Sequence, residues 1–562
     1  MRKLGKKDLT LLFLSVALIL SIIGNGILIF NYPQQPSQRD PLTLVVGTSS
    51  GPITLEIVDS DHTSEDTLGQ VVETLFTNDF YDPDLPRINL LAESYWWENT
   101  TTLHIKLREG ILFHDGTTFN ASAAKWNFDR LQYLINATGT NKGDVAHTRE
   151  LWMRPDGQTP IINNVAVVGS YNLTFTLNGA YGPFLNTLTL INAGMISPTA
   201  HEADAKNFLG LGDTLVGTGP FVYDHYTPDV EVIFTRWNEY WGKVAYFKKL
   251  HFKIYDDANS AHKDMLAGKI DFNGLASDEN IALYEDEEHI TVKRYTDDTG
   301  IPSLVYQYMT FNNNKFNQTW RKAMSYAINY SNLIDVLRER SAIRAKSPIS
   351  PGFGLTYNES VKAANYNLTR AREFMVSMGF GDMGWTDAQW IAVATSNSPF
   401  LFLDYIYDNG NQLRENLGNI VRAGLKSIGI EVYVEPYDPW WYDPFSWIFL
   451  DYSTLDVFFH GWAPDYLDPF NMLDPLVNPN SDYNYANIND TTLSTMMDLA
   501  LETTNDLIRN NIYKNIQSYM AEEGYFHAYL YHSKIIFVHS ADLRGVPYKA
   551  FGRFQAHGIW RV

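Results

Sequence analysis

The chain has 562 residues, of which 45% are apolar and 14% aromatic, and its formal net charge is −21. This length exceeds what one hydrophobic core usually serves, so at least two lobes are expected. The negative charge argues against a nucleic-acid partner, because phosphate backbones are bound through basic patches. The absence of cysteine excludes disulfides, thiolate zinc sites and cysteine nucleophiles.

The N-terminus has the pattern of a membrane anchor. Basic residues precede an uncharged run at 9–30, which as a helix is long enough to cross a hydrocarbon layer of about 30 Å. A basic flank stays cytoplasmic, so the main domain is expected outside the cell membrane. No clear small-x-small cleavage site follows, which favours a single-pass signal anchor at 1–30 over a removed signal peptide. The Pro- and Gln-rich residues 31–41 are interpreted as a linker.

The predicted elements after the linker change in character along the chain. A short apolar strand is expected at 42–47, and apolar residues at helical spacing predict a helix at 64–76. Between residues 82 and 200 the pattern alternates, most clearly at 102–107 and 173–177, which predicts an antiparallel sheet on a small subdomain.

The rest of the chain alternates between strands and helices. Further helices are expected at 121–134, 258–266, 318–339, 368–378 and 411–427. Further strands are expected at 249–255, 305–311, 430–434 and 535–538. Such alternation predicts βαβ units around a mostly parallel sheet.

Several motifs follow one another in an order and spacing that agree with a known family. In the first half they are Leu91-Ala92-Glu93-Ser94-Tyr95-Trp96, Phe113-His114-Asp115-Gly116-Thr117, Gly217-Thr218-Gly219-Pro220-Phe221 and Asn238-Glu239-Tyr240-Trp241-Gly242. In the second half they include Arg321-Lys322-Ala323, Met378-Gly379-Phe380 and Gly429-Ile430-Glu431-Val432. With these motifs the chain resembles family 5 of the bacterial extracellular solute-binding proteins, which serve ABC importers of oligopeptides, dipeptides and nickel.

The motif glycines are interpreted as structural. Gly217 and Gly219 stand where a turn needs positive φ or a close backbone approach. His114 lies in a predicted tight turn and is interpreted as a packed histidine.

The resemblance implies an α/β, two-lobed periplasmic-binding-protein fold of class II, with an extra β-rich subdomain in lobe one. The expected segments are lobe one at 42–81 and 201–302, the inserted subdomain at 82–200, lobe two at 303–532 and a return to lobe one at 533–562. Crossings between the lobes are expected near 300–304 and 529–534, and the solute would be enclosed when the lobes close.

The candidate ligand site is the run Gly461-Trp462-Ala463-Pro464-Asp465-Tyr466. It resembles the family region whose aspartate pairs with the α-ammonium group of a bound peptide, which implies this role for Asp465. A carboxylate in a closed cleft suits an ammonium group, since low dielectric strengthens the pairing. Trp462 would supply an apolar wall, and Ser49 and Ser50 in the loop after the first strand are further possible ligand contacts. Asp465 also fits a turn builder, and for Asp468 that structural interpretation is favoured.

Two departures from the family limit this assignment. Carriers of short peptides often place an arginine for the terminal carboxylate upstream, but residues 404–411 contain none. A length-restricted dipeptide site is therefore disfavoured. Nickel-type members use histidine or arginine, and His460 and His225 lack a recognisable ligand spacing.

Two rival functions remain. Gly47-Thr48-Ser49-Ser50-Gly51 matches the Gly-x-Ser-x-Gly elbow of α/β-hydrolases, but that elbow needs a helix starting at the serine. A carbohydrate-binding or sensory receptor on the same fold is the other alternative, because cleft aromatics also stack on sugars.

The sequence therefore predicts an extracytoplasmic solute-binding protein and not an enzyme. The expected partners are a peptide or similar small solute, the permease and ATPase subunits of an ABC importer, and the membrane through the N-terminal anchor. A monomer is expected, with no cofactor, no metal and no catalytic residue.

Overall fold

The computed structural model describes residues 40–59, 62–139, 145–276, 278–337, 341–437, 455–548 and 554–562. Among the helices in these ranges, none is long and apolar enough to cross a membrane. The predicted anchor at 9–30 and nearly all of the linker at 31–41 lie outside the described residues.

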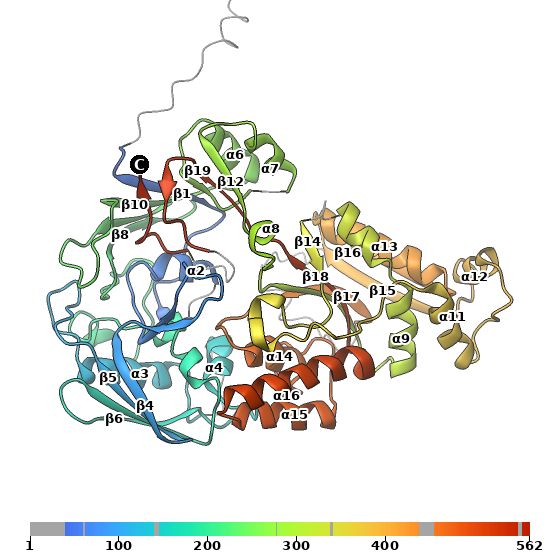
Figure 1. Cartoon of the computed structure of the whole chain (residues 1–562), viewed down its shortest axis with the longest axis horizontal. Coiled ribbons are helices and arrows are strands. Elements are labelled where there is room, and N and C mark those ends of the chain that lie inside the picture. The colour runs from blue at the N-terminus through green and yellow to red at the C-terminus, as the bar shows by residue number, and fades with distance from the viewer. Residues whose placement is uncertain are drawn as a thin grey trace, which may run out of the picture.

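Figure 1 shows two bodies side by side, with the short helix α8 (Tyr295–Thr299) between them. The first body contains a seven-stranded sheet of order β12-β19-β11-β1-β10-β9-β8. Its strands are β1 (Thr43–Thr48), β8 (Phe221–Thr227), β9 (Glu231–Arg236), β10 (Lys249–Ile254), β11 (Phe272–Asn273), β12 (Ile290–Arg294) and β19 (Ile536–Ser540). Only β1 makes parallel pairs, with β10 and β11, and all other neighbours are antiparallel.

The first body also carries a four-stranded antiparallel sheet of order β4-β5-β7-β6, as the alternating pattern predicts. Its strands are β4 (Ala92–Asn99), β5 (Thr102–Leu107), β6 (Ile162–Val167) and β7 (Asn172–Leu177). Helix α3 (Ala121–Leu134) packs on this sheet, and its first turn is capped by the Asn120 side chain, which accepts from the Ala123 N–H.

The second body is built on a six-stranded sheet of order β14-β18-β13-β17-β15-β16. The strands are β13 (Tyr306–Phe311), β14 (Ala342–Arg344), β15 (Leu401–Asp408), β16 (Ile430–Tyr437), β17 (Val457–Trp462) and β18 (His527–Ser533). Parallel pairing is confined to β15 with β16 and β17. The prediction of a mostly parallel sheet is therefore wrong, because β13 and β18, the strands next to the crossings between the bodies, run antiparallel to their neighbours.

The remaining elements complete the two bodies. In the first body they are η1 (Ile57–Asp59), α2 (His62–Leu68), β2 (Phe76–Asn78), β3 (Arg87–Asn89), α4 (Ala146–Trp152), α5 (Phe184–Thr187), η3 (Ile191–Ala193), η4 (Glu202–Asp204), α6 (Ala258–Leu266), α7 (Asp278–Tyr284), β20 (Leu543–Arg544) and β21 (Trp560–Arg561). In the second body they are α9 (Gln318–Ala327), α10 (Tyr330–Asn332), η5 (Leu333–Leu337), η6 (Pro351–Thr356), α11 (Leu368–Ser377), α12 (Asp387–Ala394), α13 (Gln412–Lys426), α14 (Pro469–Val477), α15 (Thr491–Glu502), α16 (Asp506–Ser518) and η8 (Tyr519–Gly524).

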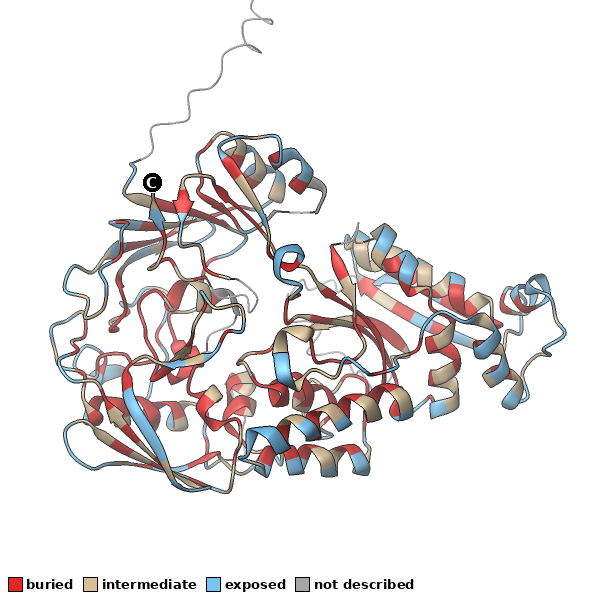
Figure 2. Cartoon of the chain, in the orientation of Figure 1, coloured by how far each residue is buried: buried red, intermediate tan, exposed pale blue. Residues whose placement is uncertain are grey.

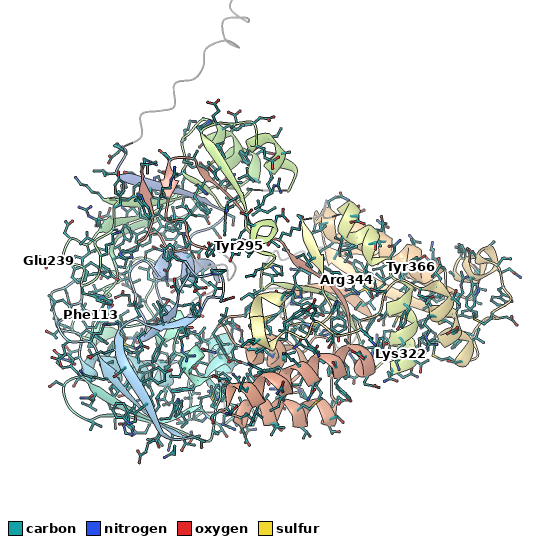
Figure 3. All side chains as sticks on the ribbon, in the orientation of Figure 1. Phe113, Glu239, Tyr295, Lys322, Arg344 and Tyr366 are labelled. Atoms are coloured by element: carbon teal, nitrogen blue, oxygen red, sulfur yellow. The ribbon has the colours of Figure 1, made fainter. Side chains whose placement is uncertain are left out.

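The chain passes between the two sheets twice, once between β12 and β13 and once between β18 and β19. Tyr295 in α8 lies between the two bodies in Figure 3, fully buried, with its ring centroid 4.2 Å from that of Tyr548. The second passage has only Lys534 and Ile535 between the strands. Any relative movement of the bodies must therefore be absorbed by the φ and ψ angles of the few residues in these connections.

Helices α14, α15 and α16 belong to the second body but lie against the first, next to α4 in Figure 1. The Gly182 N–H donates to the Leu501 carbonyl at 2.7 Å, and Asn478 Nδ2 donates to the Pro155 carbonyl at 3.0 Å. Buried residues of these helices, which are red in Figure 2, share one continuous core with the first body. A second core lies between the six-stranded sheet and helices α9, α11, α12 and α13.

Two predicted helices are shorter than expected. The helix at 64–76 ends at Leu68, because the backbone beyond it pairs with other segments: Gly219 donates to Val71 O and Met195 to Glu73 O. The helix at 318–339 breaks after Ala327, where Ile328 is extended. The apolar residues are buried in both cases, but tertiary pairing overrides the helical period.

The predicted turn around His114 is confirmed. The Phe113 N–H donates to the Thr117 carbonyl at 2.8 Å, and Gly116 has φ of 80°. His114 Nε2 donates to the Gly219 carbonyl at 2.9 Å. Burial lowers the pKa of His114, so the ring is a packed, neutral histidine.

Candidate ligand-binding site

Asp465 lies on the loop between β17 and α14, and its carboxylate is oriented by Asn471. The Asp465 N–H donates to Asn471 Oδ1 at 2.5 Å, and Asn471 Nδ2 donates to Asp465 Oδ2 at 3.0 Å. Asn471 is itself buried in the first turns of α14. A reciprocal pair of this kind fixes both the loop and the direction of the carboxylate.

The other carboxylate oxygen faces a histidine of the first body. His147 Nε2, in α4, lies 2.9 Å from Asp465 Oδ1, and the side chains are 37% and 22% exposed. Burial on its own would lower the pKa of His147, but the charge and hydrogen bond of Asp465 outweigh it, and the pKa is raised. The charges of Glu150 and Glu65 also raise the pKa of His147. The carboxylate is therefore already bonded, across the two bodies, to a side chain whose cationic form it favours.

This contact makes stability depend on pH. A histidine whose pKa is raised by folding stabilises the folded state below its unfolded pKa of about 6.5, and the stabilisation is lost as the pH rises through the folded value. His147→Gln is therefore expected to lower the melting temperature more at pH 5.5 than at pH 8.5, measured by differential scanning calorimetry. Equal losses at the two pH values would show that His147 does not pair as a cation.

Trp462 supplies part of the wall near Asp465. The indole is buried, its Nε1 donates to the Asn471 carbonyl at 2.9 Å, and its ring centroid is 5.2 Å from that of Tyr483. Tyr483 in turn meets the His147 ring edge to face at 5.3 Å. The indole N–H is therefore bonded inside the protein, which leaves the ring as an apolar surface.

The other predicted contacts lie in two places. Gly461 is half-buried at the end of β17, and a Cβ there would stand 2.5 Å from Gln307 Nε2. Ala463 is exposed on the same segment. Ser49 and Ser50 are exposed on the loop after β1, in the first body. Their contact with a ligand stays a prediction.

The loop after β1 differs from the hydrolase elbow that its sequence suggests. The residues directly after Ser49 form no helix, and the first α-helix of the body, α2, begins at His62. The strand-to-helix turn that exposes a nucleophilic serine is therefore not formed at Ser49.

Asp468 has the structural role that the sequence favours. It caps α14 by accepting from the Phe470 N–H at 2.9 Å. Its carboxylate is 1% exposed and bound by both terminal nitrogens of Arg509, at 2.6 and 2.8 Å.

The two histidines considered for nickel have other surroundings. His460 lies in β17, and burial lowers its pKa to about 3. His225 is half-exposed beside Asp224 and Glu231. Within the part of the chain that the structure describes, no group of three potential metal ligands is found.

Sequence reasoning missed His147, Asn471 and Tyr483. His147 is 318 positions away from Asp465 and belongs to no recognisable motif. Asn471 is only six positions from Asp465. Its place in the first turns of a helix that follows Asp-Pro is the one sequence feature that could have predicted its hydrogen bond to the preceding loop.

Comparison with known proteins decides the family. The family "Bacterial extracellular solute-binding proteins, family 5 Middle" matches residues 88–484 of the chain. The chain belongs to this family. Its members are solute-binding proteins of transport systems.

Curated relatives include the glutathione-binding protein GsiB of Shigella flexneri serotype 5b, which is 28% identical over 354 residues. The same protein of Escherichia coli K12 is 27% identical over 354 residues. Each alignment covers 62% of this chain and spans 63% of the length of the relative.

Solved structures share the mixed α/β fold. The periplasmic binding protein DppA of Helicobacter pylori, in complex with the peptide STSA, has a TM-score of 0.73 at 20% identity, covering 92% of this chain and 98% of its own. The dipeptide-binding protein of Pseudoalteromonas sp. SM9913, in complex with Met-Leu, has a TM-score of 0.74 at 19% identity, covering 92% and 100%. NikA of Staphylococcus aureus, in complex with Ni(L-His)2, reaches 0.69 at 16% identity with the same coverage.

Proposed function

We propose that this protein is an extracytoplasmic solute-binding protein that captures peptides or similar small solutes between two lobes and delivers them to the permease of an ABC importer. The observation that carries the proposal is Asp465: a partly exposed carboxylate, oriented by Asn471, at a contact between the two bodies. Family membership and the peptide-bound solved structures of the same fold support it.

The proposed recognition step is an exchange of cations at Asp465. The carboxylate now bonds the His147 imidazole, and the α-ammonium of a peptide would take its place. The exchange keeps the carboxylate paired, which avoids leaving a partly buried charge without a counter-ion. Because His147 and Asp465 belong to different bodies, the exchange also couples binding to the relative position of the bodies.

The wider arrangement of the chain is part of the same proposal. Lobe one comprises residues 42–81 and 201–302 and the return at 533–562, and it carries the inserted subdomain at 82–200. Lobe two comprises residues 303–532. The single-pass anchor at 1–30 would hold a monomer at the outer face of the cell membrane, next to the permease and its ATPase.

Asp465→Asn is expected to weaken the binding of tripeptides with a free N-terminus by about 10- to 100-fold, the worth of one charge-assisted hydrogen bond. Isothermal titration calorimetry on the full chain in mild detergent measures the dissociation constants of free and N-acetylated peptides. In the unmodified protein, N-acetylation of the peptide should weaken binding by the same factor. In Asp465→Asn, N-acetylation should weaken binding almost no further.

The matched control is Glu373→Gln, which removes one exposed charge from α11 and should leave affinity unchanged. If acetylated peptides bind the unmodified protein as tightly as free ones, Asp465 does not recognise the ammonium group. If no peptide of two to five residues binds at all, the proposed class of solute is wrong.

A further inference from the structure

A patch of exposed aromatic, aliphatic and basic side chains lies at one end of the first body. We call it the pole patch, and its members are Lys243, Val244, Tyr246, Lys248 and Trp560. Four of them line a groove of about 300 Å³ between the segment 243–246 and the C-terminal segment 557–560. Val244, Tyr246 and Trp560 are 37%, 40% and 42% exposed, and the Lys243 ammonium lies 5.9 Å from the centroid of the Trp560 ring. Large apolar side chains are therefore offered to solvent together, beside positive charge.

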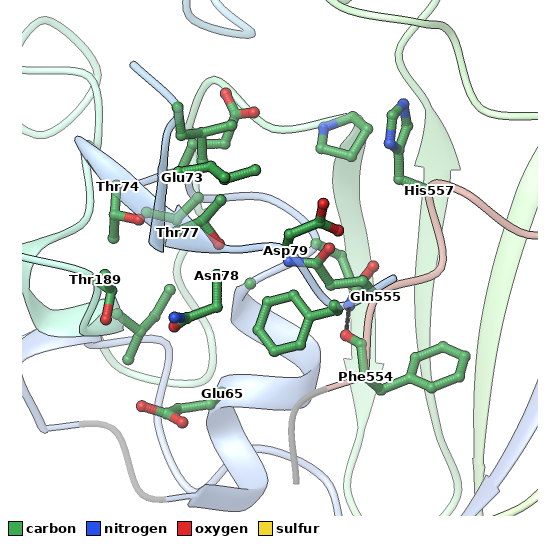
Figure 4. Close-up of a pocket in the computed structure, with 18 of the residues that line it drawn as sticks. Glu65, Glu73, Thr74, Thr77, Asn78, Asp79, Thr189, Phe554, Gln555 and His557 are labelled. Atoms are coloured by element: carbon green, nitrogen blue, oxygen red, sulfur yellow. Dashed lines mark hydrogen bonds between the residues drawn. The ribbon is translucent and has the colours of Figure 1, made fainter. Parts of the chain in front are cut away.

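The fold holds both walls of the groove in place. Phe247, between two exposed members of the patch, is fully buried and ties its segment to the core. On the other wall, His557 Nε2 donates to the Lys243 carbonyl, and Gln70 Nε2 donates to the Phe554 carbonyl at 2.7 Å. Phe554 and His557 lie on this C-terminal segment in Figure 4. The pole patch is thus a fixed feature of the first body.

The pole patch lies beside the start of β1. The Lys248 N–H donates to the Leu42 carbonyl at 2.8 Å, and the guanidinium of Arg561, the neighbour of Trp560, donates to the Pro41 carbonyl at 3.2 Å. In Figure 1 the C end of the chain accordingly lies next to β1 and β10. Both segments of the patch are therefore joined to the residues that follow the linker.

The length of the preceding chain brings this place close to the membrane. The proposed anchor ends at residue 30, and the stretch 31–39 can span at most roughly 30 Å in any conformation. The inference rests on this part of the proposed function. A surface held within that distance meets the bilayer at a high effective concentration, so weak contacts are enough to keep it there.

The charge of the patch also suits a negatively charged partner. Within the described ranges, neither Lys243 nor Lys248 takes part in an ion pair. Three carboxylates near this end have partners of their own: Asp271 and Asp542 pair with one arginine, and Asp40 accepts from a backbone N–H. In a chain of net charge −21, two lysines without counter-ions favour contact with anions on this side.

We propose that the pole patch docks on the surface of an anionic lipid bilayer, with its aromatic side chains at the level of the headgroups and its lysines against the lipid phosphates. Tryptophan and tyrosine gather at that level in membrane proteins, because one part of each side chain is apolar and the other is polar. Each lysine near an anionic membrane strengthens the attraction by about fivefold. Docking fixes the orientation of the first body relative to the membrane that holds the permease.

The test uses the full chain reconstituted into vesicles of phosphatidylcholine and phosphatidylglycerol. Because the chain contains no cysteine, Val244→Cys provides a single attachment point for a fluorophore, which spin-labelled lipids quench only on contact. The matched control is Val168→Cys, at a residue that is 62% exposed directly after β6, at the opposite end of the first body in Figure 1. The quenching constant at position 244 should exceed that at position 168 by about threefold or more.

The contribution of charge is tested by reversing the two lysines. Lys243→Glu combined with Lys248→Glu should lower the ratio of docked to undocked protein by about tenfold or more, measured as the loss of quenching at position 244. Lys106→Glu combined with Lys125→Glu makes the same change of net charge on the inserted subdomain and should leave the quenching unchanged. Vesicles of phosphatidylcholine alone should reduce the quenching as the first pair of substitutions does.

Equal quenching at positions 244 and 168 refutes the docking and, since the vesicles contain no permease, leaves the patch to a protein partner. Flotation with the vesicles in high salt reports the anchor separately, because salt screens the attraction of the lysines. A chain that floats in high salt with equal quenching keeps the anchor and loses the docking. A chain that floats only in low salt, and no longer after reversal of the lysines, keeps the docking and loses the anchor of the proposed function. A chain that never floats loses both.

Discussion

Asp468→Ala is expected to lower the free energy of unfolding by roughly 3–5 kcal/mol, the usual result of removing one partner from a buried ion pair. The Asp468 carboxylate and the Arg509 guanidinium are 1% and 9% exposed, and two hydrogen bonds join them. Burial alone would lower the pKa of Arg509, but the charge of Asp468 outweighs it and the pKa is raised. The alanine variant leaves this guanidinium buried without its counter-ion, and it also removes the cap of α14.

Urea unfolding followed by tryptophan fluorescence measures this loss. The matched control is Lys125→Ala, which breaks an exposed ion pair with Asp129 one helical turn away and should cost no more than about 0.5 kcal/mol. A loss below about 1 kcal/mol for Asp468→Ala would mean that Arg509 finds solvent or another partner, and that α14 is less firmly held to α16 than the contacts indicate.

Gly217→Ala is expected to cost about 3 kcal/mol of unfolding free energy, at the upper end of overpacking substitutions. A Cβ on Gly217 would overlap the carbonyl oxygen of Val71 and stand 3.1 Å from the Cα of Val72. The backbone there cannot withdraw easily, because Gly219 donates to that same Val71 carbonyl and Gly217 accepts from the His114 N–H. The close approach of two backbones is thus what this motif glycine permits.

Gly212→Ala provides the control in the same loop, since nothing lies within 4 Å of the Cβ it would add. It should change unfolding by less than 0.5 kcal/mol or stabilise slightly, because alanine lowers the entropy of the unfolded chain. If both substitutions cost the same in urea unfolding, the contact between residues 71 and 217 does not control stability.

Local signals located many elements well. The helices predicted at 121–134 and 258–266 have those bounds in the structure, because Asn120 and Asp257, the residues directly before them, cap their first turns. The helix predicted at 64–76 stops early because residues 70–73 bond to strands and loops more than a hundred positions away, which no local pattern encodes.

The candidate site, too, was predicted only in part from the sequence. A motif that resembles the family's ligand region pointed to Asp465, and the favoured structural interpretation of Asp468 agrees with its buried contact to Arg509. The motif gave no indication of His147, which reaches Asp465 from the other body. Ser49 and Ser50 remain predicted ligand contacts.

By itself the sequence determined the family, the α/β class and the position of one candidate carboxylate, because motifs, caps and periodicity are carried by neighbouring residues. Only the tertiary structure decided what that carboxylate touches and how the strands pair. These features depend on residues separated by tens to hundreds of positions, whose contacts arise only when the whole chain has packed. Asp465 could be named from its neighbours, but its counter-ion could not.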